Sequence, residues 1–286
     1  MLILLACAAA ILWCSGGQGQ TTATAPAEDV RFSFVQLTDT HIGRPRMLER
    51  TATAVDEINA LVMPIEFVAH TGDIFDDCIN NANVVEQGMS LFHRLTMPIH
   101  FVPGNHDIPR GGPNLTASVK NYRQRVGPLS HTIETRGVVM LFFYVEPLAA
   151  NFQVEGYDPL AWLENALKEA QGKPAIIFIH TPPVKDFFAN RAHPGWPREN
   201  VVRWNELLKR HNVKAVIAGH FHRDEMHRLG DVPLYISAPI ADLFGRQGSY
   251  RIYEYENGRL SYTTQYLEHA RRTAASAPAT ASAPAT

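Results

Sequence analysis

Residues 32–41 read Phe-Ser-Phe-Val-Gln-Leu-Thr-Asp-Thr-His, an apolar run that ends in an aspartate and a histidine. The run Phe32–Leu37 has the length and composition of a buried β-strand. Asp39 and His41, two side chains of types that bind metal ions, follow it directly. A short apolar run followed by such side chains recurs four more times, and this repetition predicts both the fold and the site.

The four further clusters also begin where a predicted strand ends. They are Gly72-Asp73 after Glu66–Ala69, Gly104-Asn105-His106-Asp107 after Ile99–Val102, His180 after Ala175–Ile179, and Gly219-His220-Phe221-His222 after Ala215–Ala218. In open α/β sheets, ligands bind outside the carboxyl ends of the strands. We therefore expect the five clusters to meet at one edge of the fold.

Helical spacing of apolar residues separates these strands, which predicts an α/β domain with mixed sheets. The predicted helices cover 47–61, 84–95, 160–167 (with Asp158 as N-cap and Pro159 at its first position) and 201–208. The remaining predicted strands are Val138–Val145, Pro233–Ser237, Ser249–Glu256 and Leu260–Leu267, the last two joined as a hairpin by Asn257-Gly258. Segments 104–131 and 181–200 contain no predicted element, and loops of that length are usually functional or mobile.

The composition limits the class of protein. The chain has 286 residues, of which 45% are hydrophobic and 19% charged, and this excludes a mainly disordered, collagen-like or coiled-coil protein. A formal net charge of −2 gives no general attraction to nucleic acid or to an anionic membrane. No specific nucleic-acid binding is therefore expected.

The two ends differ from the rest of the chain. Residues 2–13 form an uncharged apolar run that is too short to span a bilayer and is typical of a secretory signal, although no Lys or Arg precedes Arg31. Leu4-Leu5-Ala6-Cys7 resembles a lipobox, so a lipid anchor is an alternative. We expect a signal peptide and linker over 1–27, a catalytic domain over 28–270 and a disordered Ala/Pro/Ser/Thr tail over 271–286, in a protein exported to the periplasm or the medium. Cys78 alone would remain in the mature chain, which excludes an intrachain disulfide.

The clustered side chains suit a metal centre. Two Asp, one Asn and four His form an oxygen and nitrogen donor set typical of sites for Mn, Fe, Zn or Co, and the set contains no sulfur. In extended backbone, residues i and i+2 point the same way, so Asp39 and His41 could reach one ion together. His220 and His222 have the same spacing.

In this order, D-x-H, G-D, G-N-H-D, H and G-H-x-H resemble the motifs of the calcineurin-like metallophosphoesterase family, over residues 31–256. The resemblance implies a sandwich of two mixed β-sheets flanked by helices, in αββα layers. It implies two divalent metal ions with Asp73 as the bridge, and a hydroxide held between them as the nucleophile. One ion would be held by Asp39, His41, Asp73 and His222, and the other by Asp73, Asn105, His180 and His220.

The resemblance also implies roles around the metals. His106 would be the general acid, and Asp76, three residues after the bridge, would orient its ring. Purple acid phosphatases, a related group, carry a metal-bound Tyr at that position, so their Fe(III)–tyrosinate chemistry is not expected here. Arg110 and Arg223 are candidates, with Asn105 and His106, for contacts to the substrate phosphate.

The expected reaction is hydrolysis of a small phosphoester. The sequences His180-Thr181-Pro182-Pro183 and Ala218–Arg223 resemble the cyclic-nucleotide phosphodiesterase branch, which favours a nucleotide-type or other small phosphodiester. A phosphomonoesterase acting on a phosphoprotein or sugar phosphate is an alternative, and a non-catalytic metal-binding domain is another. His193, Phe187 and Trp196 in the 181–200 segment are further candidates to line the substrate pocket. The metal identity, the natural substrate and the oligomeric state stay open.

Overall fold

Two mixed β-sheets form the centre of the protein in the computed structural model, which describes residues 30–189, 191–242 and 247–268. The first sheet has the strand order β11 (Arg259–Tyr266), β10 (Ser249–Glu256), β1 (Arg31–Leu37), β2 (Val68–His70) and β3 (Ile99–Phe101). The second has the order β4 (His131–Thr135), β5 (Val138–Phe142), β6 (Ala175–Phe178), β7 (Val213–Ala218), β9 (Val232–Ile236) and β8 (Glu225–Leu229).

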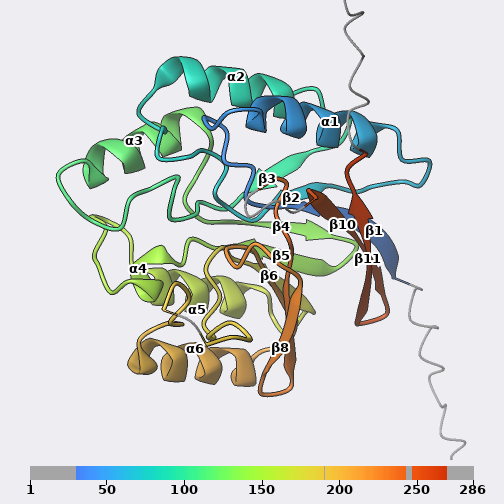
Figure 1. The fold of residues 1–286 in the computed structure, drawn as a ribbon. Helices are drawn as coiled ribbons and strands as arrows, with labels where there is room; N and C mark the ends of the chain where they lie inside the picture. The colour runs from blue at the N-terminus through green and yellow to red at the C-terminus, as the bar shows by residue number, and fades with distance from the viewer. Residues whose placement is uncertain (1–29, 190, 243–246, 269–286) are drawn as a thin grey trace, which may run out of the picture.

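Helices cover the outer face of each sheet (Figure 1). The described helices are α1 (Met47–Asn59), α2 (Ala82–Phe92), α3 (Leu115–Arg125), α4 (Glu146–Ala149), α5 (Pro159–Glu169) and α6 (Arg198–Arg210). Buried side chains of α1, α2 and α3 pack on the first sheet, and those of α5 and α6 pack on the second. The predicted αββα sandwich is confirmed.

Aromatic side chains fill the space between the two sheets. The ring of Phe34 on β1 stacks on Phe67 at 4.9 Å and on Tyr253 at 5.1 Å, measured between ring centroids. Phe142 and Phe178, on neighbouring strands of the other sheet, stack at 4.7 Å. Buried aromatic rings contribute large apolar areas, so this layer fixes how the sheets face one another.

Parallel pairing brings the strand ends together. β1, β2 and β3 run parallel, and so do β5, β6, β7 and β9. The carboxyl ends within each parallel set therefore lie at one edge of that sheet.

All nine predicted strands are present, with ends shifted by at most three residues. The turn at Asn257-Gly258 has φ of 48° and 87°, the left-handed conformation that a two-residue hairpin loop requires. The predicted N-cap is also present, since the Asp158 carboxylate accepts a hydrogen bond from the Ala161 N–H at 3.0 Å.

Four elements were not predicted. Helix α3 lies inside the 104–131 segment, the single-turn helix α4 follows β5, and strands β4 and β8 are additional. Both strands are edge strands whose residues are mostly half-buried or exposed, so their sequences lack the apolar run that identifies an inner strand.

No helix among the described residues is long and apolar enough to cross a bilayer. The predictions for 1–27 and 271–286 fall on residues outside the described ranges.

Candidate metal centre

Seven predicted donor residues come together from five loops, each at the end of a strand. Asp39, His41, Asp73 and His222 each offer a ligand atom, and these four atoms lie within 4.8 Å of one another. Asp73, His180 and His220 form a second group of the same tightness. Asp73 belongs to both groups, which is the arrangement that a bridging carboxylate requires.

The backbone at this edge is unusual. Five of the donors have positive φ: Asp39 (51°), His41 (46°), Asp73 (52°), His220 (73°) and His222 (54°). Non-glycine residues rarely adopt this conformation, and it collects at functional sites where the surrounding fold holds it. Extended backbone, which the spacing of Asp39 and His41 and of His220 and His222 suggested, is therefore absent at these positions, although Asp39 and His41 do belong to one donor group. Tight turns aim these side chains instead.

Two glycines permit the close approach of the loops. A Cβ added at Gly104 would lie 2.2 Å from the Asp73 carboxylate and 2.3 Å from its backbone N. A Cβ added at Gly219 would lie 2.0 Å from Thr38 Oγ1. A side chain at either position would push two donor loops apart.

The ring of His180 shows that the site is built for a cation. Nδ1 lies 2.8 Å from the carbonyl oxygen of Thr71, so this nitrogen carries the proton and donates it. The other nitrogen, Nε2, lies 3.1 Å from Asp73 Oδ2, 3.2 Å from Asn105 Oδ1 and 3.3 Å from His220 Nδ1. A lone pair that faces two oxygens and another ring nitrogen is repelled unless a proton or a metal ion lies among them.

The pKa values of His180 and Asp73 also indicate a site that favours positive charge. Burial by itself lowers the pKa of His180, but the Asp73 carboxylate outweighs it and raises the pKa to about 10. The pKa of Asp73 is held well below its usual range by His180 and His41, against the effect of its own burial. The pocket therefore stabilises positive charge at this point, and the donor set fits a divalent cation.

The group of Asp39, His41, Asp73 and His222 is organised around His41. Its Nδ1 lies 3.1 Å from Asp76 Oδ1, and its Nε2 lies 3.3 Å from Nε2 of His222. His222 Nε2 in turn lies 3.0 Å from Asp39 Oδ1. Because Asp76 accepts the proton on Nδ1, it orients the ring and leaves Nε2 as the ligand atom, as partners of metal-binding histidines do.

Asp76 does not hold His106 as expected. Its Oδ1 lies 3.9 Å from His106 Nδ1, whereas Oδ1 of the next residue, Asp77, lies 3.1 Å away. Asp76 is instead shared between His41 and Arg44, whose Nε lies 2.7 Å from it. The His106 ring lies 5.0 Å from the His41 ring, between centroids, and about a third of its side chain is exposed.

The two predicted phosphate contacts differ in their surroundings. Arg110 is half-exposed, pairs with the buried carboxylate of Glu146 at 3.1 Å, and donates to Thr181 Oγ1 at 3.3 Å. Arg223 pairs with the buried Asp186 and, at 2.6 Å, with Glu225. Two carboxylates engage Arg223 and one engages Arg110, so Arg110 is the more available of the two for a phosphate, and both contacts stay predictions.

Other polar residues hold the loops. The Asp107 carboxylate accepts hydrogen bonds from the backbone N–H groups of Gly104, Ile74 and Phe75 at 2.8–3.2 Å. His70 is fully buried, and its Nε2 lies 3.0 Å from the Thr40 hydroxyl. Asp107 and His70 therefore brace the loops and lie outside the two donor groups.

Three carboxylates around the site, Asp77, Glu146 and Asp186, were not predicted from the sequence. Asp77 follows Asp76 directly, and nothing in the pattern separates two adjacent aspartates. Glu146 and Asp186 become partners of the two arginines only through the tertiary fold.

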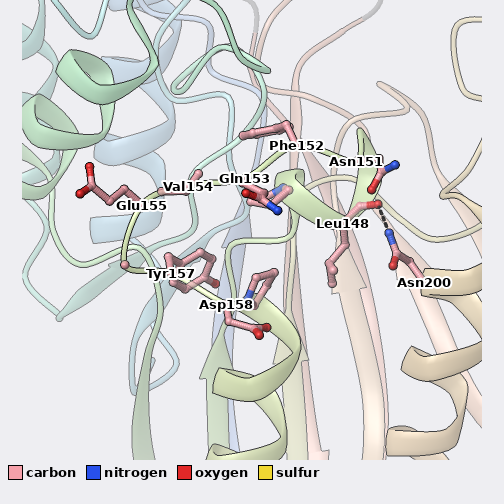
Figure 2. Close-up of a pocket in the computed structure, with 12 residues that line it drawn as sticks. Leu148, Asn151, Phe152, Gln153, Val154, Glu155, Tyr157, Asp158 and Asn200 are labelled. Carbon is pink, nitrogen blue, oxygen red and sulfur yellow. Dashed lines mark hydrogen bonds between the residues drawn. The ribbon is translucent and has the colours of Figure 1, made fainter.

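A separate cavity of ≈ 860 Å³ lies beside α4 and α5 (Figure 2). Its wall includes Leu148, whose carbonyl oxygen accepts a hydrogen bond from the Asn200 side chain at 2.9 Å. None of the seven predicted metal donors lines it.

Comparison with known proteins agrees with this geometry. The model of the calcineurin-like phosphoesterase family matches residues 32–224. The chain is 27% identical over 202 residues to "Probable glycerophosphodiester phosphodiesterase GpdQ" of Arcobacter nitrofigilis, a match that covers 66% of this chain and 71% of that protein. It is 26% identical over 195 residues to "Serine/threonine-protein phosphatase CPPED1" of Danio rerio, covering 62% of this chain and 60% of the relative.

The fold has a counterpart among solved structures. The crystal structure of a dimetal phosphatase from Danio rerio aligns with a TM-score of 0.56 and 14% identity, over 83% of this chain and 99% of that one. The family model covers well over half of the chain, in the region that carries all five motifs. The chain belongs to the calcineurin-like phosphoesterase family.

Proposed function

We propose that the protein is a dinuclear metal-dependent phosphodiesterase that hydrolyses small phosphodiesters of nucleotide or similar type. One observation carries the proposal, namely the two tight donor groups that share Asp73. Each group combines carboxylate oxygen with imidazole nitrogen, and such sets suit Mn, Fe, Zn or Co. Two divalent cations would be held there, one by Asp39, His41, Asp73 and His222, the other by Asp73, Asn105, His180 and His220.

The cations would supply the Lewis acidity that activates water and neutralises the phosphate in a P–O displacement. The chain itself prepares the site for them. Asp76 and the Thr71 carbonyl fix the proton on Nδ1 of His41 and His180, so that Nε2 of each ring faces the centre. Metal binding then requires no change of tautomer in these two ligands.

His106 is the proposed general acid. Its backbone N–H donates to Asp73 Oδ1 at 2.8 Å, which ties the residue to the proposed bridge. Asp77 accepts a hydrogen bond from Nδ1, which leaves Nε2 to deliver a proton to the leaving oxygen. His106 is more exposed than the buried His41 and His180 beside it, as a residue that meets substrate must be.

Arg110 is the proposed phosphate contact of the protein. Its ion pair with Glu146 and its hydrogen bond to Thr181 hold the guanidinium near the residue that follows His180. An arginine that is positioned in advance loses less side-chain freedom when it binds an anion. Asn105 would contribute its amide to the same phosphate.

Phosphomonoester hydrolysis is the second candidate, supported by the match to a protein phosphatase. The match to a probable glycerophosphodiester phosphodiesterase supports the first. Turnover of bis(4-nitrophenyl) phosphate and of 4-nitrophenyl phosphate, each with added Mn, Fe, Zn or Co and after chelation, separates them. We expect metal-dependent turnover with the diester preferred. A preference for the monoester would favour the phosphatase, and no turnover of either with any of these metals would favour a non-catalytic domain.

We further propose that the protein is exported, because residues 2–13 have the composition of a secretory signal. The test is to express the full chain, separate cytoplasm, periplasm and medium, and determine the N-terminal residue of the exported form. Recovery of the uncleaved chain in the cytoplasm alone would contradict export.

A further inference from the structure

An apolar groove lies at the end of the loop that carries His220 and His222, since its lining includes Arg223, the residue after His222. We call it the aromatic groove and define it by Phe187, Phe188, Met226, Tyr266 and Arg223, which line a cavity of ≈ 730 Å³. The four apolar side chains are 80%, 68%, 57% and 57% exposed, in that order. Exposed aromatic side chains gathered in one hollow are typical of a binding site rather than of a random surface.

Both phenylalanine side chains are largely exposed. Their rings stand at 89° to one another with centroids 5.3 Å apart, and the guanidinium of Arg223 lies 5.1 Å from the Phe188 centroid. The backbone N–H of Phe187 donates to the Glu225 carboxylate at 3.1 Å. The pair is therefore fixed to strand β8 and is not a free loop tip.

The groove is tied to the metal ligands. Arg223 directly follows His222, and its partner Asp186 also accepts a hydrogen bond from His193 Nδ1 at 2.8 Å. The His193 ring in turn lies 5.1 Å from the ring of His220. A phosphate at the metal centre and a group attached to it would thus meet the groove as part of the same site.

The charged side chains around the groove disfavour an anionic group there, in addition to the phosphate at the metal centre. Arg223 engages Asp186 and Glu225, and Arg251 engages Asp224 at 2.8 Å. Both arginines beside the groove are therefore already paired with carboxylates. A neutral, flat or apolar group fits this surface, whereas a polyanion or an anionic lipid headgroup does not.

We propose that the aromatic groove binds the organic group that remains on phosphorus in the diester, and that this group is aromatic, as a nucleobase is. The inference rests on the proposed phosphodiesterase function. His106, the proposed acid, follows β3, and β3 lies at the opposite edge of the first sheet from β11, whose Tyr266 lines the groove. The leaving group is therefore assigned to the side away from the groove. Stacking on Phe187 and Phe188 would then make the groove the main determinant of substrate choice.

Two substrates with the same leaving group test the proposal. Thymidine 5′-(4-nitrophenyl phosphate) carries a nucleobase on the remaining group, and methyl 4-nitrophenyl phosphate carries only a methyl. We expect the wild type to prefer the thymidine substrate in kcat/KM by about tenfold or more, the scale of one stacking contact. In the double variant Phe187→Ala, Phe188→Ala this preference should fall by about tenfold.

A control variant removes exposed apolar side chains elsewhere on the protein. Val62 and Val202 are 104% and 49% exposed and lie outside the groove, so Val62→Ala, Val202→Ala should keep the wild-type preference. Binding of phenylphosphonate against methylphosphonate, measured by calorimetry on the metal-loaded protein, gives a second readout. The wild type should favour the phenyl compound, and the double phenylalanine variant should lose that difference.

The outcomes separate the two proposals. No turnover of either diester by the wild type would overturn the phosphodiesterase function and this inference with it. Turnover of both diesters with a preference that the double variant retains would overturn the groove assignment alone. The groove could instead bind a second copy of the chain or a membrane. The groove assignment would therefore also be overturned if the double phenylalanine variant lost self-association or membrane binding while its substrate preference stayed unchanged.

Discussion

The Asp73 carboxylate lies 3.1 Å from Nε2 of His180, a nitrogen that carries no proton when the ring is neutral because Nδ1 donates to the Thr71 carbonyl. Two electron-rich atoms held this close require a proton or a metal ion between or beside them. The same carboxylate lies 3.8 Å from Nε2 of His41 in the other donor group. Asp73 is therefore the residue on which the proposed two-metal centre depends.

Replacing this carboxylate should release both ions together. Asp73→Asn keeps the shape of the side chain but removes a negative charge from both donor groups, so we expect the metal content to fall from two ions per chain to well below one. Metal analysis after dialysis against a buffered trace of Mn measures this. Asp231→Asn, at an exposed turn, is the matched control and should keep both ions. Loss of one ion with the other retained would contradict the bridge.

Adjacent aspartates should have different effects. Asp76→Asn weakens the acceptor for His41 Nδ1, so metal affinity should fall by about 10–100-fold, the usual effect of losing such a partner. Asp77→Asn changes the partner of His106, so metal binding should stay and the pH dependence of kcat should shift. The measurements are a metal titration and a pH–rate profile of both variants. If Asp77→Asn weakened metal binding and Asp76→Asn shifted the pH dependence, the result would indicate that Asp76 is the partner of His106, as the family resemblance implies.

Removing the proposed general acid should slow the reaction and leave the metals bound. We expect His106→Ala to lower kcat by about 10²–10⁴-fold on a diester with a poor leaving group. The loss should be smaller on a 4-nitrophenyl ester, because nitrophenolate departs without a proton. Metal content serves as the control. Equal losses on both substrates would argue against proton donation by His106.

A pair of histidines away from the metal centre should make stability depend on pH. His131 on β4 has its Nε2 3.2 Å from Nδ1 of His100 on β3, and its ring stacks on Phe142 at 4.7 Å. Burial, and to a lesser degree His100, lowers the pKa of His131 to about 4 from the ordinary 6.5. Below pH 6.5 the unfolded chain therefore binds more protons than the folded one, and the free energy of unfolding falls as the pH drops towards 4.

The lowered pKa of His131 also sets how much stability is lost between two pH values. Between pH 7 and pH 5, His131 should account for about 1–2 kcal/mol of lost stability, at the lower end because the side chain is only partly buried. His131→Phe should lose that part of the pH dependence while keeping the stack on Phe142. Urea unfolding of wild type and variant at both pH values measures it, and parallel pH dependences would show that His131 does not contribute.

Much of the site could be predicted because six of its seven donors follow inner strands; Asn105 follows the edge strand β3. The runs before Asp39, Asp73 and His180 are apolar, since those strands are buried on both faces, and this makes their ends visible in the sequence. Edge strands β4 and β8 and the polar helix α3 lack that signal. Their formation depends on pairing with β5 and β9 and on packing against the first sheet.

The directions of the Asp76 and Asp77 side chains could not be predicted from the sequence, because they depend on a local turn of the backbone. Asp77 has φ of 54°, so the chain turns between Asp76 and Asp77 and sends their carboxylates to different histidines. Spacing along the sequence cannot distinguish this turn from extended backbone. The ion pairs of the Arg223 guanidinium are with Glu225, two residues along the chain, and with Asp186, which only the tertiary fold brings near.

The most direct test of the two-metal centre is the anomalous scattering of the protein crystallised with Mn. We predict two peaks per chain, one in contact with Asp39, His41 and His222 and the other with Asn105, His180 and His220, with Asp73 touching both. A single peak, or peaks that lie away from Asp73, would contradict the shared two-metal centre.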